Sequence, residues 1–199
     1  ICISTRKIIV QRPIYDEFIE KFVARTKTLV SGDPLKPETV VGPLVTADAV
    51  RRVDERVKDA VAKGATLRTG GTFVGQVYEP TILTDVPYSA LASNDETFGP
   101  VVIVEPVESD DDAVAVANRV KYGLTSSVLT GAPYRGFELA QRVQAGIVNV
   151  NSSTVNDEIH APMGGIRDSG WGRTGPDGVK DFTDLIWINV RSDQARYPF

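Results

Sequence analysis

Apolar residues recur with a spacing near 3.6 in three segments of this chain, and each of these patterns predicts a helix. The first predicted helix covers about residues 14–30. The second starts after Thr46, whose side chain can cap it, and stops at Gly64. The third starts after Ser109 with three aspartates, which favour the positive end of the helix dipole, and it closes before Gly123. The apolar face of the second helix consists of Val50, Val53, Val57 and Val61.

Short runs of β-branched residues predict strands around these helices. The clearest runs are residues 8–10, 101–104, 127–129 and 147–150. From the second run to the last, strands alternate with helices, the final helix covering about residues 135–144. Such alternation is typical of parallel strands joined by right-handed crossovers. We therefore expect an α/β fold with a mostly parallel sheet and helices on both of its faces.

The composition changes after Asn151. Ser, Asn, Gly and Pro are frequent over residues 152–178, which predicts a long loop, and loops of this length are usually functional or docked onto another surface. The hydrophobic run at residues 185–190 predicts a final strand that has no partner next to it in the sequence. Because an unpaired hydrophobic strand promotes association, we expect it to pair with another segment or another subunit.

Composition and charge limit the classes of protein to which the chain can belong. Its 199 residues suit one domain with a single core, and 42% hydrophobic with 24% charged residues is typical of globular domains. A formal net charge of -4 gives no broad basic surface, so we expect neither nucleic acid nor a membrane as a partner. A single cysteine and the lack of a stretch near ~20 apolar residues favour a cytoplasmic setting. No metal is expected, because no His, Cys or acidic pair has zinc or EF-hand spacing.

Cys2 is the only cysteine and stands immediately before an apolar strand. An unpaired cysteine is ordinarily a small buried hydrophobe or an inert thiol. Natural chains rarely begin beside such a residue, so we expect this one to be the later part of a longer protein, starting at its nucleophile. His160 is the only histidine, and a Cys2/His160 dyad would make the chain a thiol hydrolase. The flanks of Cys2 lack the thiol-peptidase pattern, and a lone histidine in a polar loop is usually a surface residue.

Two further motifs contain glycine. Residues 170–175 match the pattern G-x-G-x-x-G. A phosphate loop also requires a strand before this pattern and a helix after it, and neither is predicted here. These glycines are expected to let a loop pack closely. Residues 96–100, Glu-Thr-Phe-Gly-Pro, precede the strand at Val101 and could form a plain turn. A carboxylate and an aromatic ring at the lip of a parallel strand are also suited to hold a sugar hydroxyl and to cover a flat ring.

Over essentially its whole length, the chain resembles the catalytic domain of an aldehyde dehydrogenase. The resemblance rests on seven segments in the family's order: residues 2–6 with the strand behind them, 32–34 with 42–44, 79–83, 96–100, 122–124, 146–151 and 162–170. It implies a catalytic domain at residues 1–168, without the dinucleotide-binding domain, and a loop with a C-terminal oligomerisation strand at residues 169–199. It also implies a homodimer or homotetramer assembled through residues 185–190.

The resemblance further implies roles for individual side chains. Cys2 would be the nucleophile of an NAD(P)-dependent aldehyde dehydrogenase, forming a thiohemiacetal and then a thioester. Glu96 would bind the nicotinamide ribose of NAD or NADP, and Phe98 would contact the same cofactor. The backbone N–H of Cys2 with an upstream Asn would stabilise the oxyanion, and an upstream Glu would activate water. Because those two residues and most of the cofactor site lie outside this sequence, we expect the fragment alone to be inactive.

By the same resemblance, Ile1, Ile3 and Met163 would line the substrate tunnel. Met163 stands where many relatives have Phe, which makes the wall more adaptable. Residues 154–158 and 182–187 look most like members that act on aromatic aldehydes such as benzaldehyde or vanillin, so a small aromatic aldehyde is the expected substrate. The alternatives to an aldehyde dehydrogenase are a thiol hydrolase and a non-catalytic binding module of the same fold.

Overall fold

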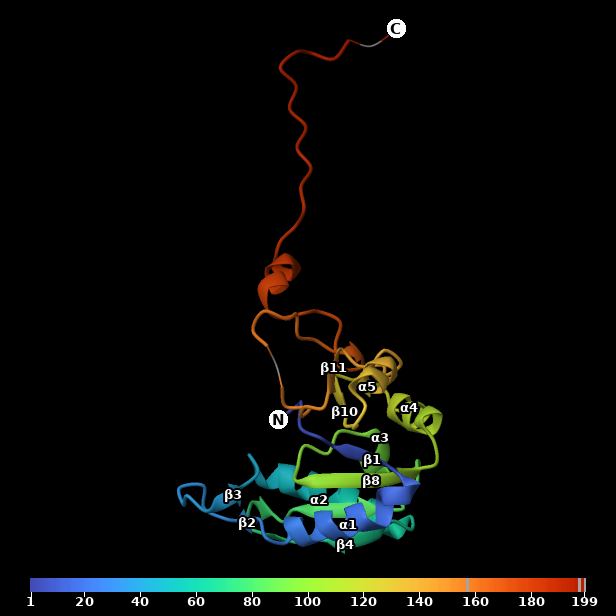
Figure 1. Ribbon diagram of the computed structural model, residues 1–199. Helices are drawn as coiled ribbons and strands as arrows, with labels where there is room; N and C mark the ends of the chain where they lie inside the picture. The colour runs from blue at the N-terminus through green and yellow to red at the C-terminus, as the bar shows by residue number, and fades with distance from the viewer. Residues whose placement is uncertain (157, 197, 199) are drawn as a thin grey trace.

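The computed structural model describes residues 1–156, 158–196 and 198. Its centre is a four-stranded sheet with the strand order β1-β8-β7-β4 (Figure 1). The strands are β1 (Lys7–Gln11), β8 (Val101–Val107), β7 (Thr81–Thr84) and β4 (Thr66–Thr69). The first three are parallel, and β4 joins the edge antiparallel to β7. The structure confirms the expected α/β fold with a mostly parallel sheet.

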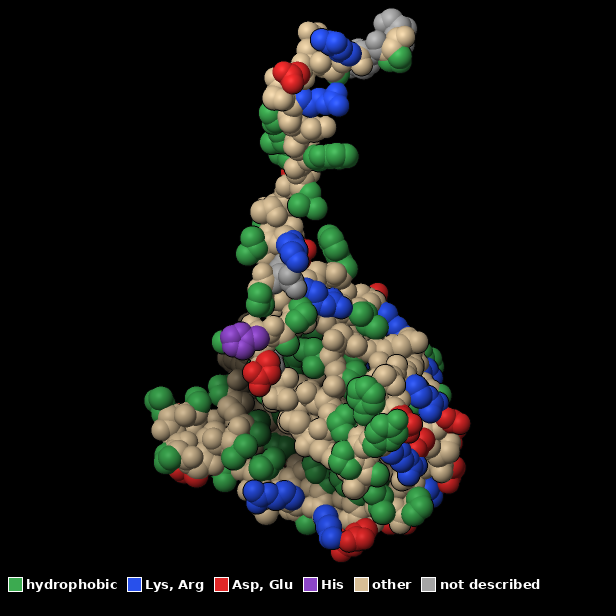
Figure 2. All heavy atoms as spheres, turned by 45° about the horizontal axis from the view of Figure 1, so that its top comes forward, with side chains coloured by type: hydrophobic (Ala, Val, Ile, Leu, Met, Phe, Trp, Pro, Cys, Tyr) green, Lys and Arg blue, Asp and Glu red, His purple; other side chains and the backbone are tan. Residues whose placement is uncertain are grey.

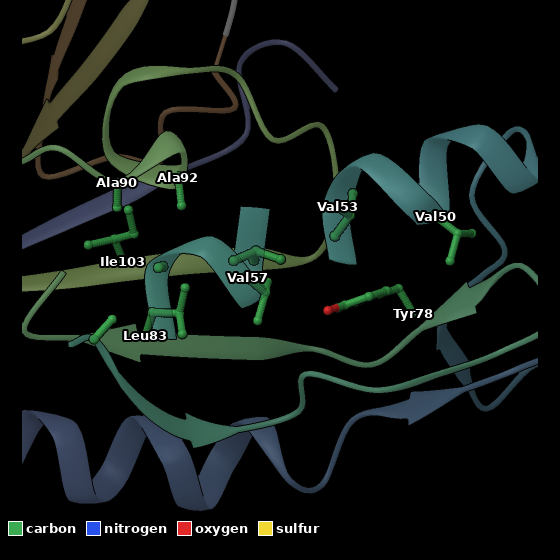
Figure 3. Packing of buried hydrophobic residues seen from close by; sticks show 11 residues of the cluster. Val50, Val53, Val57, Tyr78, Leu83, Ala90, Ala92 and Ile103 are labelled. Carbon is green, nitrogen blue, oxygen red and sulfur yellow. The ribbon is translucent and has the colours of Figure 1, made fainter. Parts of the chain in front are cut away.

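Helices cover both faces of this sheet. α1 (Arg12–Thr26) packs on one face, and α2 (Ala47–Ala62) with the short α3 (Leu91–Asn94) packs on the other (Figures 1 and 3). Successive residues of a strand point to opposite faces, so Leu83 belongs to the core of α2, whereas its neighbour Ile82 belongs to the core of α1. Across the described residues, no helix has both the length and the apolar character needed to cross a membrane.

The sequence of α2 explains where it starts and which face it buries. The Thr46 hydroxyl oxygen accepts a hydrogen bond of 3.1 Å from the backbone N–H of Ala49, which satisfies one of the free donors of the first turn. Asp48 lies in the same turn and favours the positive end of the helix dipole. The helix predicted after Thr46 is confirmed. Its buried stripe, which faces the strand of Leu83 in Figure 3, includes Val50, Val53 and Val57. The expectation for Val61 was wrong, since this residue near the end of the helix is 43% exposed.

Replacing Thr46 with alanine is expected to lower the free energy of unfolding by about 1 kcal/mol, because the N–H of Ala49 then loses its partner. The measurement is urea unfolding followed by circular dichroism. The control is Thr66→Ala, which removes the same atoms from an exposed position of β4 where the threonine side chain makes no hydrogen bond to any described residue. Equal losses in the two variants would contradict a capping role for Thr46.

After β8, alternating elements lead to a second sheet. They are α4 (Asp110–Asn118), β10 (Thr125–Val128), α5 (Pro133–Ala140) and β11 (Ile147–Val150). β10 and β11 are parallel, as expected, but they form a two-stranded sheet of their own. The reason is that β8 already has β1 on one edge and β7 on the other, so no edge of β8 is left for β10. The alternation therefore continues from one sheet into another.

Some boundaries differ from the sequence pattern because short strands compete with helices. α1 ends at Thr26, since the residues after it enter a β2–β3 pair, and α4 ends at Asn118, since a β9–β12 pair follows. Long-range pairing overrides the local helical pattern in both places. A hairpin of β5 with β6 was not predicted. These strands are β2 (Val30–Ser31), β3 (Thr39–Val41), β5 (Phe73–Val74), β6 (Val77–Tyr78), β9 (Tyr122–Gly123) and β12 (Ile166–Arg167).

The segment after β11 has more structure than the loop predicted for residues 152–178. It contains β12 and the start of a 3-10 helix, η1 (Pro176–Phe182). Residues 183–190 lead away from both sheets and form no ladder with the described part of the chain (Figure 1). Their apolar side chains, among them Trp187, are exposed, as the upper part of Figure 2 shows. Pairing of this segment with another subunit stays a prediction.

Candidate active site around Cys2

Cys2 lies in a tight turn directly before β1. The backbone N–H of Ser4 donates a hydrogen bond of 3.0 Å to the carbonyl of Ile1, so Cys2 occupies the second position of this turn. Cys2 is exposed, whereas the neighbouring Ile3 is 6% exposed and anchors the turn in the protein. The turn therefore presents the thiol to molecules that approach from outside.

The same turn is tied to the second sheet by one side chain. The hydroxyl oxygens of Thr5 and Thr154 are 2.9 Å apart and share a hydrogen bond. Thr154 follows β11, and its carbonyl accepts a hydrogen bond of 3.2 Å from the hydroxyl of Thr125 in β10. The segment that carries Cys2 thus lies at the junction between the four-stranded sheet, which it enters through β1, and the sheet of β10 and β11.

Arg6, the last residue before β1, reaches the segment that leads into β8. Its Nη1 donates hydrogen bonds to the carbonyl oxygens of Asp95 at 2.9 Å and Ser93 at 3.3 Å. Burial lowers the pKa of the Arg6 guanidinium, and the neighbouring Tyr122, Glu96 and Asp95 act in the opposite direction. A partly buried cation therefore connects the Cys2 turn with the Glu96 segment.

Glu96 and Phe98 are both exposed in the segment that leads into β8. Thr97 is buried, so the residues on either side of it face outward. Phe98 is 63% exposed and has a φ of 48°, a conformation that is uncommon for a residue with a side chain and that occurs preferentially at functional sites. Gly99 lets this turn lie against α2, since a Cβ there would be 2.6 Å from Cγ2 of Val53. An exposed carboxylate and an exposed ring fit a ribose and the flat ring attached to it.

Met163 is held by the glycine-rich segment that follows it. The backbone N–H and the hydroxyl of Thr174 donate hydrogen bonds to the Met163 carbonyl at 2.7 Å and 3.2 Å. A Cβ on Gly164 would lie 2.3 Å from the carbonyl oxygen of Gly172, so only glycine allows the two loop segments to come this close. Among the glycines predicted to serve loop packing, Gly175 fits the prediction, since a Cβ there would lie 3.1 Å from the Ala161 carbonyl oxygen, whereas a Cβ on Gly170 would meet nothing within 4 Å.

The residues that the sequence predicts for the site differ in exposure. Cys2, Ile1, Glu96 and Phe98 are exposed, Met163 is partly buried and Ile3 is buried. Their contacts with an aldehyde or a cofactor stay predictions. Sequence reasoning missed Arg6 and Thr154, which hold the Cys2 segment in place. No sequence signal singles out Arg6, because its neighbour Lys7 is also a cation before the apolar run.

His160 is exposed and makes no hydrogen bond with Cys2 within the described residues. A general base acts over about 2.6–3.2 Å or through one water molecule, and the direct hydrogen bond of a hydrolase dyad does not form between these two described side chains. In the same part of the chain, no group of three or more His, Cys, Asp or Glu side chains could hold a metal ion.

Two hollows on the surface have volumes of about 600 Å³ each, and neither contains the predicted site. One lies against α1 near Arg68, and the other lies along α2 near Leu91. Cys2 and Glu96, both of which are exposed, line neither of these two hollows.

Residues 1–188 match the model of the aldehyde dehydrogenase family, and the chain belongs to this family. It is 38% identical over 199 residues to vanillin dehydrogenase from Pseudomonas fluorescens and 38% identical over 201 residues to a benzaldehyde dehydrogenase from Bacillus subtilis, covering 100% of this chain and 41% of each relative. Its structure is similar to that of salicylaldehyde dehydrogenase from Pseudomonas putida G7 complexed with salicylaldehyde, with a TM-score of 0.94 and 36% identity over 100% of this chain and 42% of the other. The chain thus spans about two fifths of the length of these relatives.

Two solved structures that are similar to this chain contain nicotinamide cofactors. A betaine aldehyde dehydrogenase from Staphylococcus aureus in complex with NAD+ has a TM-score of 0.85 and 30% identity over 88% of this chain and 37% of the other. A glyceraldehyde-3-phosphate dehydrogenase from Methanocaldococcus jannaschii complexed with NADP has a TM-score of 0.83 and 34% identity over 88% of this chain and 38% of the other.

Proposed function

We propose that this chain provides the catalytic cysteine and part of the cofactor site of an NAD(P)-dependent aldehyde dehydrogenase, which oxidises an aldehyde to a carboxylic acid. The observation that carries the proposal is the connection, through Arg6, between the turn that exposes Cys2 and the segment that exposes Glu96. Family membership supports it, because the relatives are named for the same reaction.

The reaction begins with attack of the Cys2 thiolate on the aldehyde carbon, since the deprotonated sulfur is the nucleophile. A C–S bond forms, the carbonyl electron pair moves to oxygen, and a thiohemiacetal results. The backbone N–H of Cys2 donates no hydrogen bond within the described residues and is free to stabilise this oxyanion. A bound nicotinamide cofactor supplies the acceptor for the hydride. The resulting Cys2 thioester is hydrolysed by water, which breaks the C–S bond and releases the acid.

The residues present fit the nicotinamide ribose end of NAD or NADP. The Glu96 carboxylate would accept hydrogen bonds from the ribose hydroxyls, and the Phe98 ring would contact the cofactor. The choice between the two cofactors depends on a group that reads the 2′-phosphate. Titration of the complete protein with each cofactor decides which one it accepts.

Glu96→Gln is expected to raise the KM for the accepted cofactor about tenfold, because a neutral amide forms weaker hydrogen bonds with ribose hydroxyls than a carboxylate does. The measurement is initial-rate kinetics of the complete protein with NAD+ and with NADP+. Glu38→Gln makes the same chemical change at an exposed position outside any contact described for the chain, and it serves as the control. A wild-type KM in Glu96→Gln would remove Glu96 from the cofactor site.

The proposed substrate is a small aromatic aldehyde. Relatives named for vanillin, benzaldehyde and salicylaldehyde support this substrate class. In the proposal, Ile1 and Met163 contact the aromatic ring, and the buried Ile3 supports this apolar wall from the protein side. The test compares kcat/KM for benzaldehyde, vanillin and acetaldehyde, and a higher value for acetaldehyde would overturn the aromatic preference.

The proposed protein is a cytoplasmic homodimer or homotetramer assembled through residues 185–190. Support comes from the exposed apolar side chains of this segment, which would be covered if the segment added a strand to a partner's sheet. Deletion of residues 183–199 is the test, with mass measured by light scattering after size-exclusion chromatography. An unchanged mass would reject assembly through this segment.

A further inference from the structure

Arg6 contacts both β8 and the segment before β8. Its carbonyl oxygen accepts a hydrogen bond of 3.0 Å from the backbone N–H of Ile103, which makes it the first link between the Cys2 segment and β8. Its Nη1 donates to the carbonyl oxygens of Asp95 and Ser93 at 2.9 Å and 3.3 Å. The backbone and the side chain of one residue therefore hold the two halves of the proposed active site together.

The shorter of the two side-chain hydrogen bonds reaches the peptide group next to Glu96. The Asp95 carbonyl belongs to the planar peptide unit that joins Asp95 to Glu96. Holding this oxygen fixes the orientation of the plane and, with it, the direction in which the Glu96 side chain leaves the backbone. The negative charge of Glu96 in turn favours the charged form of the Arg6 guanidinium.

A second cation leaves Arg6 free to act on these carbonyls. The Nζ of Lys121 lies 3.1 Å from Oδ1 of Asp95, so the Asp95 carboxylate is paired with Lys121. Arg6 itself forms no ion pair at salt-bridge distance with any carboxylate in the described part of the chain. Its donors are directed at the main chain that carries Glu96.

We propose that Arg6 is a positioning residue that sets the placement of Glu96 relative to the Cys2 turn. With this placement, the Glu96 carboxylate can bind the ribose of the cofactor while the Cys2 thiolate reaches the aldehyde beside it. This inference rests on the proposed function. The next residue, Lys7, pairs with Glu105 at 3.3 Å instead of with the Glu96 segment. Lys7 is therefore a matched control, because it is also a partly buried cation at the start of β1.

The test compares Arg6→Met, Arg6→Lys and Lys7→Met in the complete protein. Isothermal titration calorimetry gives the Kd for NAD+ and for NADP+, and the rate of alkylation by iodoacetamide without cofactor reports the reactivity of Cys2. Arg6→Met is expected to raise the Kd of the accepted cofactor about tenfold, because a misplaced carboxylate loses its hydrogen bonds. The alkylation rate is expected to stay within about twofold of wild type, since the Cys2 turn keeps its own hydrogen bond.

The two other variants separate positioning from general damage. Arg6→Lys keeps the charge and one carbonyl contact, so its Kd is expected to rise only about threefold. Lys7→Met is expected to leave the Kd unchanged. A Kd within about twofold of wild type in folded Arg6→Met overturns the inference, and so does an equal rise in Lys7→Met. If Arg6→Met does not fold, Arg6→Lys decides: a rise of about threefold supports the inference and an unchanged Kd overturns it.

Failure of the proposed function has a different signature. Wild-type protein that binds neither NAD+ nor NADP+ contradicts the proposed function, and the role of Arg6 falls with it. If the wild-type protein binds a cofactor and folded Arg6→Met binds it equally tightly, only the proposed role of Arg6 is contradicted.

Discussion

Replacing Cys2 with alanine is expected to reduce kcat for aldehyde oxidation by the complete protein by a factor of about 10⁴ or more, because no thiolate remains to form the thiohemiacetal. The Kd of the cofactor is expected to change by less than about twofold, since the buried Ile3 and the hydrogen bond between Thr5 and Thr154 still hold the turn. Initial rates of NADH or NADPH formation and calorimetric titration measure the two quantities.

His160→Ala is the matched control and also separates the two enzyme hypotheses. His160 is exposed and has no hydrogen bond with Cys2 in the described residues, so aldehyde oxidation is expected to stay within about twofold of wild type. Loss of acyl transfer in His160→Ala would instead favour a Cys2/His160 hydrolase. Full activity of Cys2→Ala would contradict covalent catalysis by this cysteine.

The second large effect is expected for stability. Leu83→Ala is expected to lower the free energy of unfolding by about 2–5 kcal/mol, because a large buried side chain is lost and a cavity remains. Leu83 is 0% exposed and packs beneath α2 (Figure 3). Its strand, β7, has β8 on one side and β4 on the other, so the backbone has little freedom to close the cavity. Urea unfolding followed by circular dichroism measures the loss.

Leu35→Ala is the control for this experiment. Leu35 is 90% exposed, so removing the same atoms there is expected to change the free energy of unfolding by less than about 0.5 kcal/mol. A loss at Leu83 as small as the one at Leu35 would show that the sheet does not form the core of the protein in solution.

The fold could be predicted from the sequence where its determinants are local. The helix α2 is an example, since its cap, Thr46, and its apolar stripe lie within one stretch of chain. The end of α1 could not be predicted, because Val30 pairs with Thr39 and a local pattern contains no information on that contact. Separation into two sheets depends on β8 accepting β1 and β7 as neighbours, and both come from distant parts of the chain.

For the candidate site, the sequence showed the reactive groups but not what joins them. A thiol at Cys2, a carboxylate at Glu96 and a ring at Phe98 are residue types that can be recognised directly. The link between them is a hydrogen bond from Arg6 to a main-chain carbonyl 89 residues away. Every residue has such a carbonyl, so the sequence carries no signal for this contact.

The hydrogen bond between Thr5 and Thr154 has a mechanical consequence. It links the loop after β11 to the segment before β1. A displacement of one sheet relative to the other would therefore also displace the backbone near Cys2. The rate at which Cys2 reacts with an electrophile is therefore expected to report the relative position of the four-stranded sheet and the β10–β11 sheet. A ligand that separates the two sheets would change this rate even if it binds far from Cys2.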